Sequence, residues 1–224
     1  LGLAERLAQP TTLALTLAFA AIGQYRLGEW RNARKSGERM HAIAETHGLT
    51  FVARDSLVYQ FCAEVREGGE GHFEQAFDAV MPGTIYGPVN RWVETRLLLA
   101  DAASAVGDVV RALRALDAIP AGQRDAGHAP EIHRIHGELL VRRDQRDEAE
   151  ACFRRAIEIA RRRSQRALEL RATTSLARLL AGTGQRDEAR RILHDIYSWF
   201  TEGFDTADLR TARALLNELS AASP

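Results

Sequence analysis

Three histidines lie close together in the sequence, at His128, His133 and His136, and histidine is a common zinc ligand. His133 and His136 are three residues apart and could share one helix face. The usual helical zinc motif instead places two histidines four residues apart with a glutamate between them, and here only Glu131 and Glu138 could add a ligand. We therefore expect no metal and no cofactor, and a metal-dependent enzyme centred on these histidines is an outlying alternative.

The other patterns that could support catalysis are incomplete. Cys62 and Cys152 lie within apolar stretches, where cysteine usually acts as a small buried residue. The sequence contains no Gly-x-Ser-x-Gly motif, the turn that exposes a nucleophilic serine. The glycine-rich segment 68–71 lacks the Lys-Ser/Thr pair of a phosphate-binding loop and indicates a turn. The sequence therefore predicts a protein that is not an enzyme.

The charge pattern argues against nucleic-acid and membrane partners. Thirty basic residues balance thirty acidic ones, so no overall field attracts a polyanion. The densest basic run is Arg161–Arg163 with Arg166; no aromatic residues are interleaved with it, and it is typical of a solvated helix end. The most apolar run, 13–22, is too short to cross a bilayer. We expect a cytoplasmic protein that binds neither nucleic acid nor membrane.

An internal repeat organises the chain. The string Gln-Arg-Asp-Glu-Ala occurs at 145–149 and again, unchanged, at 185–189, forty residues later. A turn residue stands five positions before the alanine, and the same pairing recurs along the chain. The pairs are Gly28/Ala33, Gly71/Ala76, Gly107/Ala112, Asp144/Ala149 and Gly184/Ala189. This spacing is close to the tetratricopeptide period of about 34 residues.

The repeat predicts an all-α fold: a right-handed α-solenoid of about five tetratricopeptide-like helix pairs, forming a single array over residues 1–224. The expected pairs are 10–26 with 29–47, 50–67 with 70–81, 88–106 with 108–118, 130–143 with 145–163, and 166–182 with 185–199. They therefore span 10–47, 50–81, 88–118, 130–163 and 166–199. A capping helix is expected at 205–220, because the last pair would otherwise leave an apolar face in water.

Three further features refine this expectation. Pro10, Pro88 and Pro130 are each expected to open a helix, where a missing N–H costs little. The stretch 119–129 is the one long break between pairs. The absence of an initiator methionine before Leu1 predicts that the chain is a fragment of a longer protein.

In such arrays the first helix of each pair lines the concave face, and this register selects candidate partner-binding residues. At the carboxyl end they are charged: Arg134, Glu138, Arg142, Arg171 and Arg178. At the amino end they are aromatic, at Tyr25 and Phe61. Arginine binds carboxylates through two parallel hydrogen bonds, so the arginines could hold an acidic peptide or a chain terminus.

The alternative is that these side chains satisfy one another. Acidic and basic residues on neighbouring helices, with Glu131 added to the set, could form ion pairs that leave no donors for a partner. At the apolar end, Tyr25 and Phe61 could simply pack against other helices.

The carboxyl-terminal part also resembles a known group of proteins. The residues that carry the resemblance are Gly137-Glu138-Leu139-Leu140, Ala149-Glu150-Ala151-Cys152-Phe153, Ala156-Ile157-Glu158-Ile159-Ala160, Leu168-Glu169-Leu170-Arg171-Ala172 and the segment 197–209. About the last ninety residues are similar to the carboxyl-terminal tetratricopeptide region of multidomain bacterial signalling proteins. In these proteins a class III adenylate or guanylate cyclase domain, or a DNA-binding domain, precedes a STAND-type ATPase.

The resemblance implies a regulatory role. The expected function is non-enzymatic recognition of a protein, peptide or small ligand through the concave face, and the partners include intramolecular ATPase or cyclase domains. A homodimer formed through the exposed amino-terminal edge is a further expectation. The alternative is a free-standing tetratricopeptide adaptor that binds peptide segments.

Overall fold

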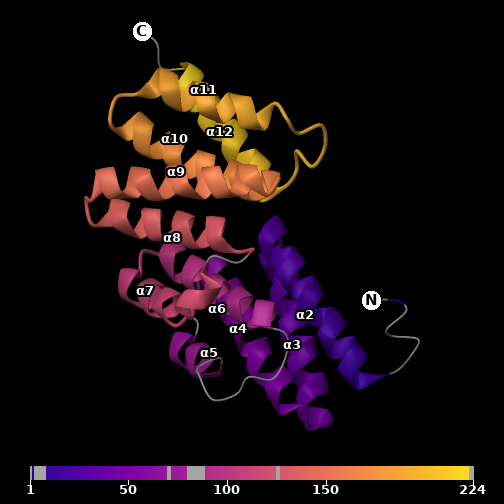
Figure 1. Ribbon diagram of the computed structural model, residues 1–224. Helices are drawn as coiled ribbons and strands as arrows, with labels where there is room; N and C mark the ends of the chain where they lie inside the picture. The colour runs from indigo at the N-terminus through magenta and orange to yellow at the C-terminus, as the bar shows by residue number, and fades with distance from the viewer. Residues whose placement is uncertain (1, 3–8, 70–71, 80–88, 125–126, 222–224) are drawn as a thin grey trace. The chain divides into compact units, whose positions relative to one another are not determined.

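The computed structural model describes residues 2, 9–69, 72–79, 89–124 and 127–221, and it contains helices and no strand in that part of the chain (Figure 1). The α-helices are α2 (Pro10–Leu27), α3 (Trp30–Thr46), α4 (Thr50–Arg66), α5 (Phe73–Ala79), α6 (Val89–Ala105), α7 (Val109–Asp117), α8 (Ala129–Arg142), α9 (Arg146–Arg162), α10 (Arg166–Gly182), α11 (Arg186–Tyr197) and α12 (Ala207–Ala221). A single 3-10 turn, η1, covers Ala121–Gln123. The prediction of an all-helical chain is confirmed.

The helix limits lie close to those expected from the sequence. Ten of these helices begin and end within two residues of the predicted positions. The helix expected at 70–81 is described only as Phe73–Ala79, because residues 70–71 and 80–81 lie outside the described residues. The predicted turn residue Gly71 and the predicted helix-opening Pro88 lie outside them as well.

The chain divides into two compact units, Leu1–Pro120 and Ala121–Pro224, and the division falls inside the long break predicted at 119–129. Within each unit, consecutive helices pack on one another. We call α2, α4, α6, α8 and α10 the first helices, because each opens a pair. First helices also contact one another: α2 packs on α4 and α4 on α6 in unit 1, and α8 packs on α10 in unit 2.

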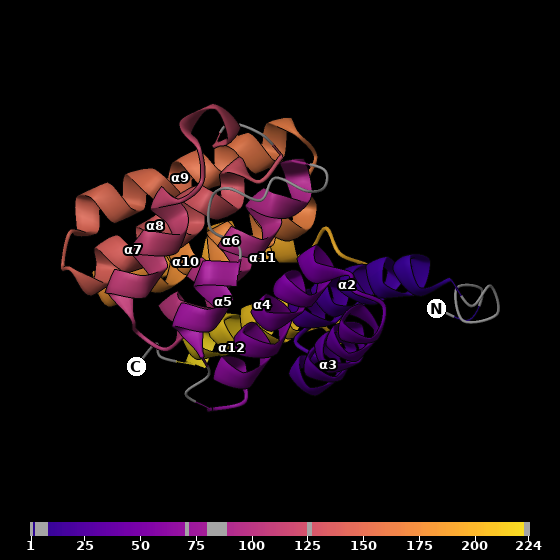
Figure 2. The same cartoon turned by 90° about the horizontal axis from the view of Figure 1, so that it is seen from below.

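The predicted capping helix α12 packs on both α10 and α11, so it continues the row of first helices in unit 2. Within that unit α8 and α9 lie side by side in both views (Figures 1 and 2). The packing is therefore repeat-like within each unit. The handedness of the solenoid and the tetratricopeptide type of pairing stay predictions.

The same backbone turn ends every first helix. A residue with positive φ follows the helix, and the N–H of the next residue donates to the carbonyl five positions earlier over 2.8–3.0 Å. This is the Schellman arrangement, which satisfies carbonyls that the helix end leaves open. The residues with positive φ are Gly28, Gly68, Gly107, Asp144 and Gly184.

Two of these turns bear directly on the sequence analysis. Asp144 has φ 60° and replaces glycine, as the repeat alignment required. In the second pair Gly68, with φ 92°, makes the turn, three residues before the glycine chosen from the sequence. Asp, as at position 144, tolerates a positive φ better than most residues because its short side chain forms hydrogen bonds with the nearby backbone.

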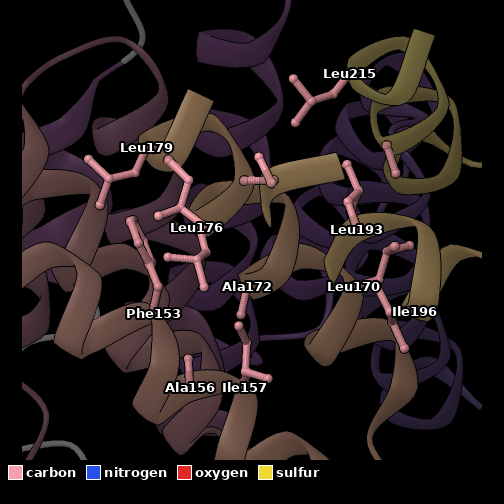
Figure 3. Close-up of a cluster of buried hydrophobic side chains, with 14 of the residues drawn as sticks. Phe153, Ala156, Ile157, Leu170, Ala172, Leu176, Leu179, Leu193, Ile196 and Leu215 are labelled. Carbon is pink, nitrogen blue, oxygen red and sulfur yellow. The ribbon is translucent and has the colours of Figure 1, made fainter. Parts of the chain in front are cut away.

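The core of unit 2 contains a close contact between the two helices of a pair. Gly137 of α8 faces the ring of Phe153 of α9, and an added Cβ at Gly137 would lie 2.6 Å from Cε1 of that ring. Phe153 is fully buried and belongs to an apolar cluster that joins α9, α10, α11 and α12 (Figure 3). Glycine at 137 therefore lets the two helices of the pair approach closely enough for the ring to fill the gap between them.

Gly37 shows a related constraint in unit 1. An added Cβ at Gly37 would lie 3.1–3.3 Å from Ser56 and Gln60 of α4. Helix α3 thus packs directly against the backbone of α4.

We expect Gly137→Ala to destabilise the protein, although alanine is the better helix former. Overpacking a filled core typically costs about 1–3 kcal/mol. Removing glycine from a helix recovers at most about 1 kcal/mol. The free energy of unfolding, measured by urea denaturation, should therefore fall by about 1–2 kcal/mol.

The matched control is Gly182→Ala in the same unit. Gly182 is the last residue of α10, and a Cβ there would meet nothing within 4 Å. This variant should be as stable as the natural protein or slightly more so. Equal stabilisation by both substitutions would contradict the close contact.

Candidate functional site

Arg134 of α8 lies at the centre of a buried charge network in unit 2. Its Nε donates to Oε1 of Glu131 over 3.1 Å, and its Nη1 donates to Oε1 of Glu138 over 2.6 Å. Arg134 and Glu131 are both buried. A charge can be buried at tolerable cost when it is paired and hydrogen-bonded, and both conditions hold here.

The network extends across three helices. Arg171 of α10 contacts Oε1 of Glu131 at 2.9 Å and Oδ1 of Asp208, on α12, at 3.7 Å. The hydroxyl of Ser175, also on α10, donates to Glu138 over 2.8 Å. These contacts bring Arg134, Glu138 and Arg171 into one network. They also realise the alternative interpretation for these three residues, because the acids and arginines bond to one another.

Arg142 and Arg178 differ from the other two arginines of the predicted clamp. Both are exposed. Arg142 lies one turn after Glu138 on α8, and Arg178 lies two turns after Arg171 on α10, so each continues the face of its helix that carries the network. They are the basic side chains of the predicted site that a partner could reach.

The aromatic residues of the predicted site lie in the interior of unit 1. Tyr25 is 4% exposed and Phe61 is 5% exposed. Phe61 packs edge-on against Phe73 of α5, with ring centroids 5.4 Å apart. Tyr25 packs against Trp30 at 5.0 Å. Both rings are thus packing residues in this conformation, and no partner could contact them without a rearrangement.

A second polar network holds Tyr25 in place. Its hydroxyl donates to Oδ2 of Asp101 on α6 over 3.1 Å, and it accepts a hydrogen bond from Nε of Arg66, on α4, over 3.0 Å. Arg66 also pairs with Asp101. Burial, together with the nearby Asp101 carboxylate, raises the pKa of Tyr25 well above its usual value, so the hydroxyl stays protonated and donates.

Further charged contacts in unit 1 were not apparent from the sequence. Arg26 of α2 donates from Nε to Glu94 of α6 over 2.9 Å. Arg96 is almost fully buried, and burial lowers its pKa to about 10, an effect that the carboxylate of Asp55 opposes. The sequence does show that Arg96 is a charged residue within an apolar helical stretch, which indicates a buried ion pair. It does not show which acidic residue lies next to Arg96.

The histidines and cysteines considered in the sequence analysis have few contacts with one another in the part of the chain that the structure describes. No three His, Cys, Asp or Glu side chains are placed there to share a metal ion. Cys152 Sγ lies 3.7 Å from Nδ1 of His136, and burial raises the pKa of its thiol. A raised pKa reduces the thiolate fraction, which is the nucleophilic form.

Within the described ranges, no helix is both long and apolar enough to cross a lipid bilayer. No protein-family model matches the chain. A search of curated proteins found no match either.

We expect Glu131→Gln to destabilise unit 2, because it removes the carboxylate that Arg134 and Arg171 share. Removing one partner of a buried ion pair costs about 3–5 kcal/mol. Here Glu138 and Asp208 remain as secondary partners, so we expect about 2–3 kcal/mol in urea denaturation followed by circular dichroism. Glu158→Gln is the control, because Glu158 pairs with Arg155 and Arg162 on the open surface and its loss should leave the midpoint unchanged.

The two cysteines should differ in reactivity toward a thiol reagent. Cys62 is fully buried. Burial raises the pKa of its thiol well above the usual value, and the Asp101 carboxylate raises it further. At about pH 8 only the half-buried Cys152 thiol of the native protein should react with the reagent, and it should react slowly. In denaturant both thiols should react. A Cys152→Ser variant should be inert when folded, and rapid labelling of that variant would show that Cys62 is accessible.

Proposed function

We propose that the chain is a non-enzymatic, tetratricopeptide-like interaction and regulatory segment of a bacterial signalling ATPase or nucleotide cyclase. The repeated helix pairs, the shared Schellman turns and the contacts between first helices support a repeat array of this type. On this proposal the array is a right-handed solenoid, it acts in the cytoplasm, and its partner is a protein or peptide. The partner includes intramolecular ATPase or cyclase domains.

One observation carries the binding part of the proposal: charged side chains of α8, α10 and α12 share a face that ends in two exposed arginines. The network around Glu131 fixes the three helices relative to one another through Arg171 and Asp208. It therefore holds the helix faces that present Arg142 and Arg178 before any partner arrives. A preformed face costs a partner less ordering free energy than a flexible one.

The chemistry of the exposed residues defines the partner. A guanidinium group matches a carboxylate in shape and charge, so an acidic peptide segment or a carboxyl terminus suits Arg142 and Arg178. Arg134 and Arg171 position this surface but do not contact the ligand, since their donors are used by Glu131, Glu138 and Asp208.

We expect a fluorescein-labelled, glutamate-rich peptide with a free carboxyl terminus to bind the chain, and the variant Arg142→Ala/Arg178→Ala to bind it about tenfold more weakly. Two exposed ion pairs of about 0.7 kcal/mol each correspond to that factor. Fluorescence polarisation measures the dissociation constant directly.

The matched control is Arg190→Ala/Arg191→Ala, which removes the same charge from the second helix α11. Both residues are exposed and pair only loosely, with Asp187 at 3.7 Å and Asp195 at 3.6 Å. This variant should keep the natural affinity. Equal weakening in both double variants would reduce the effect to overall charge, and absence of binding at about 1 mM peptide would reject the arginine site.

A further inference from the structure

The turn between α9 and α10 in unit 2 is rich in arginine. Arg161 and Arg162 end α9, and Arg166 begins α10. Arg161 and Arg166 share the carboxylate of Glu169, and Arg162 pairs loosely with Glu158 at 3.6 Å. The arginines of this turn therefore outnumber the carboxylates that pair with them, and the excess positive charge favours an anion.

One buried carboxylate places two of these arginines side by side. Nε of Arg161 donates to Oε1 of Glu169 over 2.6 Å, and Nη1 of Arg166 donates to Oε2 over 2.7 Å. The side chain of Glu169 is 3% exposed, whereas those of Arg161 and Arg166 are 56% and 36% exposed. A guanidinium group has five N–H donors, so each arginine has further donors that its exposure leaves open to solvent. An anion arriving from the solvent would meet two cations that the protein has already positioned.

An exposed aromatic ring lies next to the same arginines. The ring of Trp199, in the segment between α11 and α12, has its centroid 5.5 Å from Cζ of Arg166. Trp199 is 56% exposed, which is unusual for so large a side chain. Phe200 packs edge-on against it, with ring centroids 5.2 Å apart. No aromatic residue is interleaved with the basic run in the sequence, but the fold brings one to it from a distant part of the chain.

The combination of cations with an open ring selects the ligand. Inorganic phosphate or an acidic peptide would use the arginines and leave the ring of Trp199 without a partner. A nucleotide supplies both groups, because guanidinium groups bind its phosphate oxygens and its planar base stacks on tryptophan. A strand of nucleic acid needs a basic groove several nucleotides long, whereas this run occupies a single turn between two helices.

We propose that the turn between α9 and α10 binds a nucleotide, with its phosphates on Arg161 and Arg166 and its base stacked on Trp199. Glu169 positions both arginines and does not contact the ligand. Helix α9 has 17 residues and is about 25 Å long, and Arg142 precedes its other end. The nucleotide site is therefore distinct from the peptide site, and this inference goes beyond the proposed function and does not depend on it.

Isothermal titration calorimetry of the full chain with ATP, without divalent cations, tests the proposal. ATP should bind with a dissociation constant of about 1 mM or below, because exposed ion pairs and one stacked base act together. Adenosine and inorganic tripolyphosphate each carry only one part of the ligand. Both should bind at least about fivefold more weakly than ATP.

Substitutions separate the two parts of the site. Trp199→Ala should weaken ATP binding at least about fivefold and leave tripolyphosphate binding unchanged, because it removes only the stacking surface. Trp199→Phe should keep most of the affinity, since it retains an aromatic ring. Arg161→Gln should weaken ATP and tripolyphosphate alike, by about threefold. Arg166 still pairs with Glu169 in that variant, so circular dichroism should be unchanged.

Arg190→Gln is the matched control, because it removes an exposed arginine of α11 that pairs loosely with Asp187 at 3.7 Å. This variant should bind ATP as the natural chain does. The proposal is wrong if ATP does not bind at about 10 mM, or if it binds no more tightly than tripolyphosphate. Equal weakening by Arg161→Gln and Arg190→Gln would also overturn it, because the effect would then come from overall charge.

Discussion

The chain reverses direction after each first helix, and the rest of the fold depends on that reversal. A left-handed residue followed by a hydrogen bond to the fifth carbonyl back achieves it at all five positions. Because of this turn, the second helix of a pair runs antiparallel to the first. Because the reversal is short, side chains such as Phe153 must fill the space between two closely spaced helices, and a small residue such as Gly137 must face them.

Polar networks take a specific place in this arrangement. They lie on the faces where first helices meet, with Glu131 joining α8 to α10 and Asp101 joining α2 to α4 and α6. Apolar packing alone would allow neighbouring helices to slide, whereas a buried carboxylate accepts hydrogen bonds in only a few geometries. Such contacts add little net stability, but losing one partner is costly, which is how they can define the register of adjacent helices.

The same networks bury part of the candidate site. Arg134, near the middle of α8, and Tyr25, near the carboxyl end of α2, form their hydrogen bonds inside the protein. Arg142 and Arg178, toward the carboxyl ends of α8 and α10, are exposed. On α8 and α10, buried charged side chains and exposed ones thus lie on the same helix face.

Local sequence determined the helices, their limits and most of their turns, because these depend on residues a few positions apart. The repeated string at 145–149 and 185–189 and four of the five turn residues, Gly28, Gly107, Asp144 and Gly184, follow from spacing along the chain. Only the tertiary structure decided which charged and aromatic residues are buried and which residues they contact. Whether Arg171 pairs with Glu131 depends on which helices lie next to each other, and that information resides in contacts between segments tens of residues apart.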